Sequence, residues 1–92
     1  MFSLYTKLRF KDEVVYTELY DEVVIMNIID GRYYSLNSVG SAVWKQLTAP
    51  KTISSLCAYM EQKFEVTAEV CRTDVLLLAE QLYNVGLIDI VE

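Results

Sequence analysis

The residue types that most often carry out chemistry are few in this chain. It contains no His and two Cys, Cys57 and Cys71. A structural or catalytic zinc site needs at least three Cys, His or carboxylate ligands in a defined arrangement, and two thiols alone do not form one. Neither Cys has a base beside it in the sequence that would activate it as a nucleophile. We therefore predict no metal site and no catalytic cysteine.

The carboxylates and glycines also form no catalytic pattern. Asp12 with Glu13 and Asp21 with Glu22 are adjacent pairs in or near predicted turns, where contact with water is the ordinary explanation. The three glycines, at positions 31, 40 and 86, stand too far apart to form a phosphate-binding loop. The sequence therefore predicts a protein that is not an enzyme and that needs no cofactor.

Composition limits the remaining classes of function. The chain has 92 residues, 53% of them hydrophobic, which favours one compact domain over residues 1–92. Its net charge of −5 and the absence of a basic cluster argue against a polyanionic partner, because phosphate binding depends on Lys and Arg. No apolar run reaches the roughly 20 residues of a membrane span, and the N-terminus lacks signal-peptide features. We expect a cytoplasmic protein with reduced, buried thiols and without membrane or nucleic-acid partners.

The first third of the chain has the pattern of β-strands. Strands are predicted at 14–19, 23–29 and 32–36, and the short connections between them make an antiparallel meander. Asp30-Gly31 is a strong hairpin signal, because Gly adopts positive φ at little cost. In the third strand, Tyr34 and Leu36 share the face toward the helices, and Tyr33 lies on the other face. Residues 1–13 are either an arm or an extra strand; the sequence leaves both alternatives open.

The remainder has the pattern of three helices, predicted at 38–48, 53–64 and 68–85. Asn37, Thr52 and Thr67 are suitable N-caps, and Gly86 follows the last helix. Trp44 is expected in the core. An α+β fold, with a three-stranded antiparallel sheet followed by three helices, is therefore predicted.

The third predicted helix carries more apolar positions than one buried face requires. One stripe is expected in the core, and it comprises Cys71, Val75, Leu78, Leu82 and Val85. A second stripe lies beside it, and it comprises Val70, Asp74, Leu77 and Gln81. Either a small domain wraps this helix on three sides, or one flank borders a groove for a ligand.

Several motifs occur in an order that resembles a known family. The run from Asp30 to Trp44 contains a Gly, an aromatic pair, a Leu-Asn and a Gly before the Trp. Phe64-Glu65-Val66-Thr67 and Gly86-Leu87-Ile88 follow at the matching places. In these features residues 14–90 resemble the PqqD-like proteins.

The resemblance implies a winged-helix-like RiPP recognition element. Such domains bind the leader of a ribosomally made precursor peptide between the third strand and the third helix, where the leader adds as a further strand. The chain most resembles the discrete leader-binding proteins of lasso-peptide pathways. The implied partners are a precursor leader, a separate leader peptidase and a cyclase, and the implied leader anchors are a Tyr, a Pro three residues on and a Leu. The predicted peptide-binding residues are Arg32, Tyr33, Tyr34, Ser35, Leu36, Val70, Asp74, Leu77, Leu78 and Gln81.

Three alternatives stand beside this interpretation. The first alternative is a PqqD-type peptide chaperone for a radical-SAM enzyme, the second is a winged-helix DNA-binding protein, and the third is a structural subunit of a larger complex. A recognition helix normally carries several Arg, Lys, Asn or Gln residues near its start. Between Ala68 and Leu78 the one basic residue is Arg72, against Glu69 and Asp74. The charge pattern therefore disfavours DNA binding.

Overall fold

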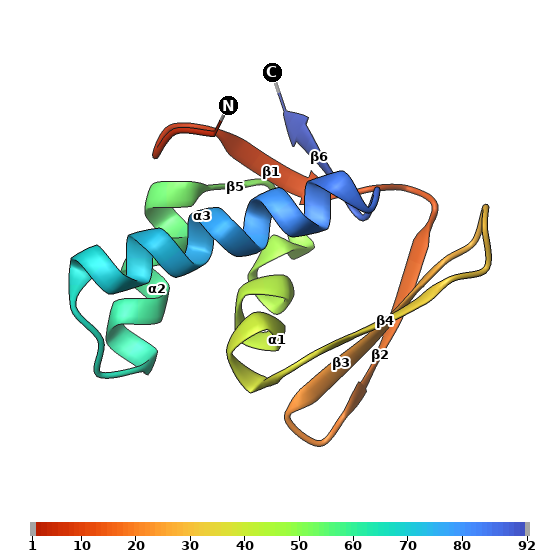
Figure 1. Cartoon of the computed structure of the whole chain (residues 1–92), viewed down its shortest axis with the longest axis horizontal. Helices are drawn as coiled ribbons and strands as arrows, with labels where there is room; N and C mark the ends of the chain where they lie inside the picture. The colour runs from red at the N-terminus through yellow and green to blue at the C-terminus, as the bar shows by residue number, and fades with distance from the viewer. Residues whose placement is uncertain (1, 92) are drawn as a thin grey trace.

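The computed structural model describes residues 2–91 and confirms the α+β fold class, with two small sheets and three α-helices (Figure 1). Seventeen buried apolar residues, from Leu8 near one end of the chain to Ile88 near the other, form one core cluster. The elements in chain order are β1 (Lys7–Phe10), β2 (Val14–Leu19), β3 (Glu22–Asn27), β4 (Tyr33–Leu36), α1 (Ser38–Lys45), a 3₁₀ turn η1 (Gln46–Thr48), β5 (Lys51–Thr52), α2 (Ile53–Lys63), α3 (Ala68–Asn84) and β6 (Ile88–Val91).

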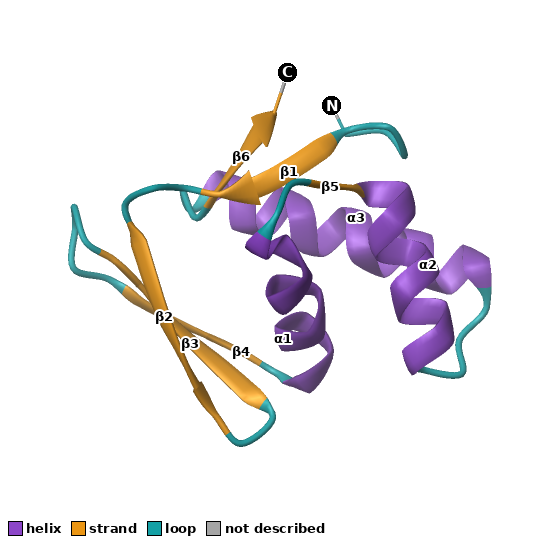
Figure 2. Cartoon of the chain, turned by 180° about the vertical axis from the view of Figure 1, so that it is seen from behind, coloured by secondary structure: helices purple, strands orange, loops and turns teal. Residues whose placement is uncertain are grey.

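The predicted meander is the sheet β2-β3-β4, antiparallel throughout. Alternate residues of its central strand, Val23 and Ile25, are fully buried because α1 covers that face. Figure 2 shows α1 on one side of this sheet and no helix on the other. Tyr34 and Leu36 pack toward the core and Tyr33 is exposed, as the alternation predicts.

Strand β3, the second strand of the predicted meander, is shorter than its β-branched sequence predicts. It ends at Asn27, not at Ile29, because local hydrogen bonds turn the chain there. The Asn27 side-chain oxygen accepts from the Ile29 N–H at 2.9 Å, and the Asn27 carbonyl accepts from the Gly31 N–H at 2.8 Å. Gly31 has a φ of 71°, which a turn of this kind requires. Strand β4, the third strand of the predicted meander, likewise begins at Tyr33 and not at the predicted Arg32.

The N-terminal segment is an extra strand, although it joins a second sheet and not the meander. Strand β1 lies between β5 and β6 and runs antiparallel to both. Leu8 and Ile88 of this sheet are buried, and the Phe10 ring stacks on Trp44 with centroids 4.3 Å apart. The first and last strands of the chain therefore close one side of the core together.

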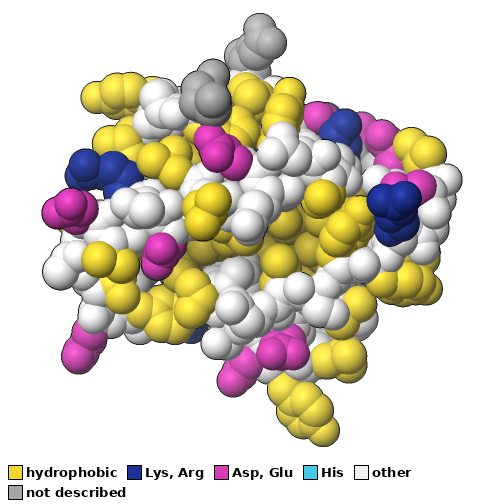
Figure 3. All heavy atoms as spheres, in the orientation of Figure 1, with side chains coloured by type: hydrophobic (Ala, Val, Ile, Leu, Met, Phe, Trp, Pro, Cys, Tyr) yellow, Lys and Arg dark blue, Asp and Glu magenta, His cyan; other side chains and the backbone are white. Residues whose placement is uncertain are grey.

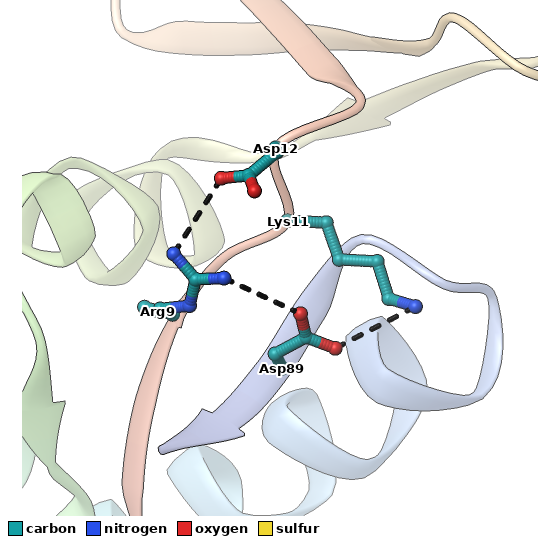
Figure 4. A network of polar contacts seen from close by, with 4 residues as sticks. All are labelled: Arg9, Lys11, Asp12 and Asp89. Atoms are coloured by element: carbon teal, nitrogen blue, oxygen red, sulfur yellow. Dashed lines mark hydrogen bonds and ion pairs between the residues drawn. The ribbon is translucent and has the colours of Figure 1, made fainter.

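An ion network covers the exposed face where β1 and β6 pair (Figure 4). Arg9 lies opposite Asp89 across the two strands, at 3.8 Å, and also contacts Asp12 at 3.5 Å. Lys11 reaches the other oxygen of Asp89 at 3.5 Å. Exposed pairs like these contribute little singly, but together they form a network that links β1 to β6.

The three helices begin where their caps predict. The side chains of Asn37, Thr52 and Thr67 accept from the N–H groups three residues later. Helix α1 ends at Lys45, three residues earlier than expected, and the chain continues as η1. Trp44 is fully buried, as expected of a core residue.

Val85 is not part of the core, although the helical stripe predicts it. Helix α3 ends at Asn84, and Val85 is its C-cap with φ −92° and ψ 2°. Because the helix ends before Val85, this residue does not follow the core stripe, and its side chain is 41% exposed.

No helix within residues 2–91 is long and apolar enough to cross a membrane.

Candidate functional site

Strand β4 has an open edge, since its one neighbour in the sheet is β3. The Asn27 N–H donates to the Arg32 carbonyl at 3.0 Å, which makes positions 27 and 32 a hydrogen-bonded pair. Such pairs alternate along an antiparallel ladder, so Tyr34, opposite Ile25, also faces β3 with its backbone groups. The N–H and C=O groups of Tyr33 and Ser35 therefore point away from β3, toward the open edge.

A serine of α1 completes the other end of the same ladder. The Val23 N–H donates to the Ser41 Oγ at 2.8 Å, and the Ser41 hydroxyl donates to the Leu36 carbonyl at 3.1 Å. Val23 and Leu36 are register partners, so the hydroxyl stands where the last direct ladder bond would be. Ser41 is fully buried. This bridge fixes the end of β4 against the start of α1.

A hollow of about 360 Å³ lies between β4 and α3, and we call it the edge groove. Figure 3 shows an apolar floor in the hollow part of this face, below the surface of α3. Both β4 and the C-terminal half of α3 contribute walls. Its lining residues are Tyr33, Tyr34, Ser35, Leu36, Leu78, Gln81, Leu82, Val85 and Leu87.

A second hollow of about 140 Å³ lies among the three helices, and we call it the helix pocket. Leu78 lines both hollows, so the pocket adjoins the edge groove along α3. Its lining is apolar apart from one thiol and one carboxylate. The lining residues are Val39, Val43, Met60, Phe64, Val66, Cys71, Asp74, Val75 and Leu78.

Seven of the ten predicted site residues line one of these two hollows. Tyr33, Tyr34, Ser35, Leu36, Leu78 and Gln81 line the edge groove, and Asp74 lines the helix pocket. Arg32, Val70 and Leu77 line neither. Leu77 is 54% exposed and lies three residues after Asp74 and four before Gln81, which are its neighbours on the helix surface. It therefore forms a rim between the two hollows.

Sequence reasoning missed most of the helix pocket. Val39, Met60, Phe64 and Val66 come from α1, α2 and the loop before α3, and only tertiary packing brings them together. No signal in the sequence marked Val39 or Val66 as pocket residues; in the structure their side chains are 42% and 40% exposed. A helical pattern does not specify which neighbouring helix meets it.

The two cysteines are buried, free and in contact. The Cys71 Sγ donates to the Cys57 carbonyl at 3.4 Å. Burial, together with the neighbouring Cys57, raises the pKa of the Cys71 thiol from 9.0 to about 11. The thiol in the helix pocket is therefore neutral near pH 7, and Asp74 is the one acidic residue in the lining. Across residues 2–91, no cluster of three or more His, Cys, Asp or Glu residues forms that would hold a metal ion.

Comparison of the sequence with models of known protein families identifies the family of this chain. The sequence model of Coenzyme PQQ synthesis protein D (PqqD) matches residues 22–88.

The chain belongs to the PqqD family. The matched residues include β3, β4 and all three helices, and hence both hollows. Strands β1 and β2 precede the match, so each of the two sheets lies partly outside it. Among curated proteins, none matches the chain.

Two solved structures share the fold of this PqqD family member. One is TbiB1 in complex with the TbiA(beta) leader peptide, with 26% sequence identity and a TM-score of 0.84 over 88% of this chain and 94% of that one. The other is a lasso peptide synthetase B1 complexed with the leader peptide, with 17% identity and a TM-score of 0.80 over 89% and 96% of the two chains. At 17% identity, the second likeness concerns the fold alone.

Proposed function

We propose that this chain binds the leader of a ribosomally synthesised precursor peptide by strand addition to β4 and delivers it to separate processing enzymes. The observation that carries the proposal is the open edge of β4, where Tyr33 and Ser35 direct unpaired backbone groups beside the edge groove. An extended peptide satisfies such groups by pairing with them. Backbone pairing is nearly blind to sequence, so the walls supplied by α3 provide selectivity.

The lasso-peptide type is the favoured branch. Its support is the 26% identity to TbiB1, which was solved with the TbiA(beta) leader peptide. In this role the chain is a non-catalytic cytoplasmic adaptor, and a leader peptidase and a cyclase act on the bound precursor. The family match also supports a second candidate, a PqqD-type peptide chaperone for a radical-SAM enzyme. The genes that neighbour this chain's gene discriminate between the two candidates. Genes for a peptidase and a cyclase favour the lasso-peptide type, and a gene for a radical enzyme favours the PqqD-type chaperone.

Calorimetric titration tests the proposal with the synthetic leader of the precursor gene that neighbours this chain's gene. We expect saturable one-to-one binding of that leader, and none of a scrambled peptide with the same composition. Equal binding of both peptides would contradict the proposal, because composition alone would then explain the affinity.

The leader should carry apolar anchor residues, because selectivity resides in pockets. If the lasso resemblance holds, these are a Tyr, a Pro and a Leu. Replacing each by Ala should weaken binding about tenfold or more, since a buried anchor contributes roughly 2 kcal/mol. The same titration measures the loss, with Ala at a leader position between the anchors as the control. Unchanged affinity for all three replacements would exclude anchor recognition.

A further inference from the structure

Helices α2 and α3 pack against each other (Figure 1), and each brings one cysteine to the contact. The Cys71 Sγ donates to the Cys57 carbonyl at 3.4 Å, and the two thiols are also within hydrogen-bond reach of each other. Their side chains are 7% and 3% exposed for Cys57 and Cys71, so the packing holds both in place. Two thiols held this close need little backbone movement to form a disulfide.

One of the two thiols can be reached from outside through the helix pocket. Cys71 lines this hollow of about 140 Å³, and Cys57 does not. A water molecule takes about 30 Å³ in the liquid, so hydrogen peroxide, with two oxygen atoms, fits the hollow. A bulky oxidant such as oxidised glutathione does not fit. Cys71 is therefore the thiol that a small peroxide meets first.

We propose that Cys57 and Cys71 are a modification site, at which hydrogen peroxide oxidises Cys71 and Cys57 then closes a disulfide between α2 and α3. In the first step the Cys71 sulfur attacks one peroxide oxygen, the O–O bond breaks, and a sulfenic acid and one water form. In the second step the Cys57 sulfur attacks the Cys71 sulfur, the S–O bond breaks, and a second water leaves. Two thiols are thereby oxidised to one disulfide, and one peroxide is reduced to two waters.

The cross-link has a defined effect on stability. It joins positions 14 residues apart and closes a loop that contains Phe64 and Val66 of the helix pocket. Closing such a loop restricts the unfolded chain, so the oxidised protein should have a Tm about 10 °C higher than the reduced protein. The proposal does not depend on leader binding.

Peptide mapping after peroxide treatment tests the proposal. The full chain is incubated with excess hydrogen peroxide, because burial raises the pKa of both thiols and a protonated thiol reacts slowly. Catalase then removes the peroxide, and free thiols are alkylated after denaturation. Trypsin cuts after Lys51, Lys63 and Arg72, so the disulfide should join peptide 52–63 to peptide 64–72 within one molecule. Dithiothreitol, which does not reduce methionine sulfoxide, should separate the two peptides and lower the Tm again.

Cys57→Ala is the matched control, because it keeps Cys71 and removes the thiol that closes the disulfide. Dimedone, which traps sulfenic acids, should label Cys71 in this variant and leave the wild-type protein unlabelled. Alkylation of both wild-type cysteines after peroxide treatment, or a disulfide that forms only between two molecules, would overturn the inference. So would equal dimedone labelling of Cys71 in the two proteins, since Cys57 would then not react with the sulfenic acid.

Discussion

At the scale of single residues, Ser41 joins two elements through one hydroxyl, and its removal has a calculable cost. Ser41→Ala leaves the buried Val23 N–H and the Leu36 carbonyl without their partner. Unsatisfied buried groups cost roughly 1–3 kcal/mol, so the free energy of unfolding should fall by about that amount. Urea denaturation measures it. The control is Ser54→Ala, at an exposed position of α2, which should change the free energy of unfolding by less than about 0.5 kcal/mol. Equal losses of stability in the two variants would show that the Ser41 bridge does not stabilise the fold.

The raised pKa of Cys71 predicts a pH dependence with a defined sign. The folded thiol keeps its proton up to a pKa of about 11, whereas the unfolded thiol loses it near 9.0. Between these values the native state binds more protons, so stability is fully present below pH 9 and falls as the pH rises toward 11. Urea denaturation at a series of pH values should show this loss, and Cys71→Ala should reduce it. Identical pH profiles for the two proteins would contradict the account.

At the scale of elements, the two edge strands of the meander provide a matched test of strand addition. The Ser35 N–H points to the open edge of β4, and Pro is tolerated where an edge N–H faces away from the sheet. Ser35→Pro should therefore leave the fold intact and abolish most leader binding, because it removes a donor that the leader needs. Calorimetry measures binding, and circular dichroism checks the fold.

The control is a proline on the opposite edge strand. The Ile28 N–H donates to the Glu13 carbonyl, and by the same alternation Glu18 of β2 points its N–H away from β3. Glu18→Pro should leave leader binding close to wild type. If Glu18→Pro lost leader binding and Ser35→Pro retained it, the leader would bind at the edge of β2 and not at the edge of β4.

Most elements were predictable because their signals are local. The β-branched and aromatic residues of Val14–Leu19, the Asp30-Gly31 turn and the caps Asn37 and Thr67 are signals that depend on neighbouring residues alone. The second sheet was not predictable, since β5 has two residues and β6 pairs with a strand at the other end of the chain. The edge groove followed from two predictable elements, whereas the helix pocket needed the packing of three helices.

At the scale of the whole molecule, the groove depends on both ends of the chain. Phe10 of β1 stacks on Trp44 of α1, and α1 in turn holds β4 through Ser41. Leu87, which precedes β6, lines the edge groove itself. The terminal strands, which the ion network of Arg9, Lys11, Asp12 and Asp89 links, therefore support the walls of the edge groove.

The most direct test of leader binding at the β4–α3 face combines amide NMR titration with two matched substitutions. Leu77→Glu places a charge on the rim between the two hollows, and Leu19→Glu places one at an equally exposed leucine of β2, 56% against 54%. With labelled wild-type protein, leader-induced shifts should cluster on residues 32–36 and 70–82. Leu77→Glu should fold and lose leader binding, and Leu19→Glu should bind as the wild type does. Shifts confined to α1 and α2, with full binding by Leu77→Glu, would contradict the account.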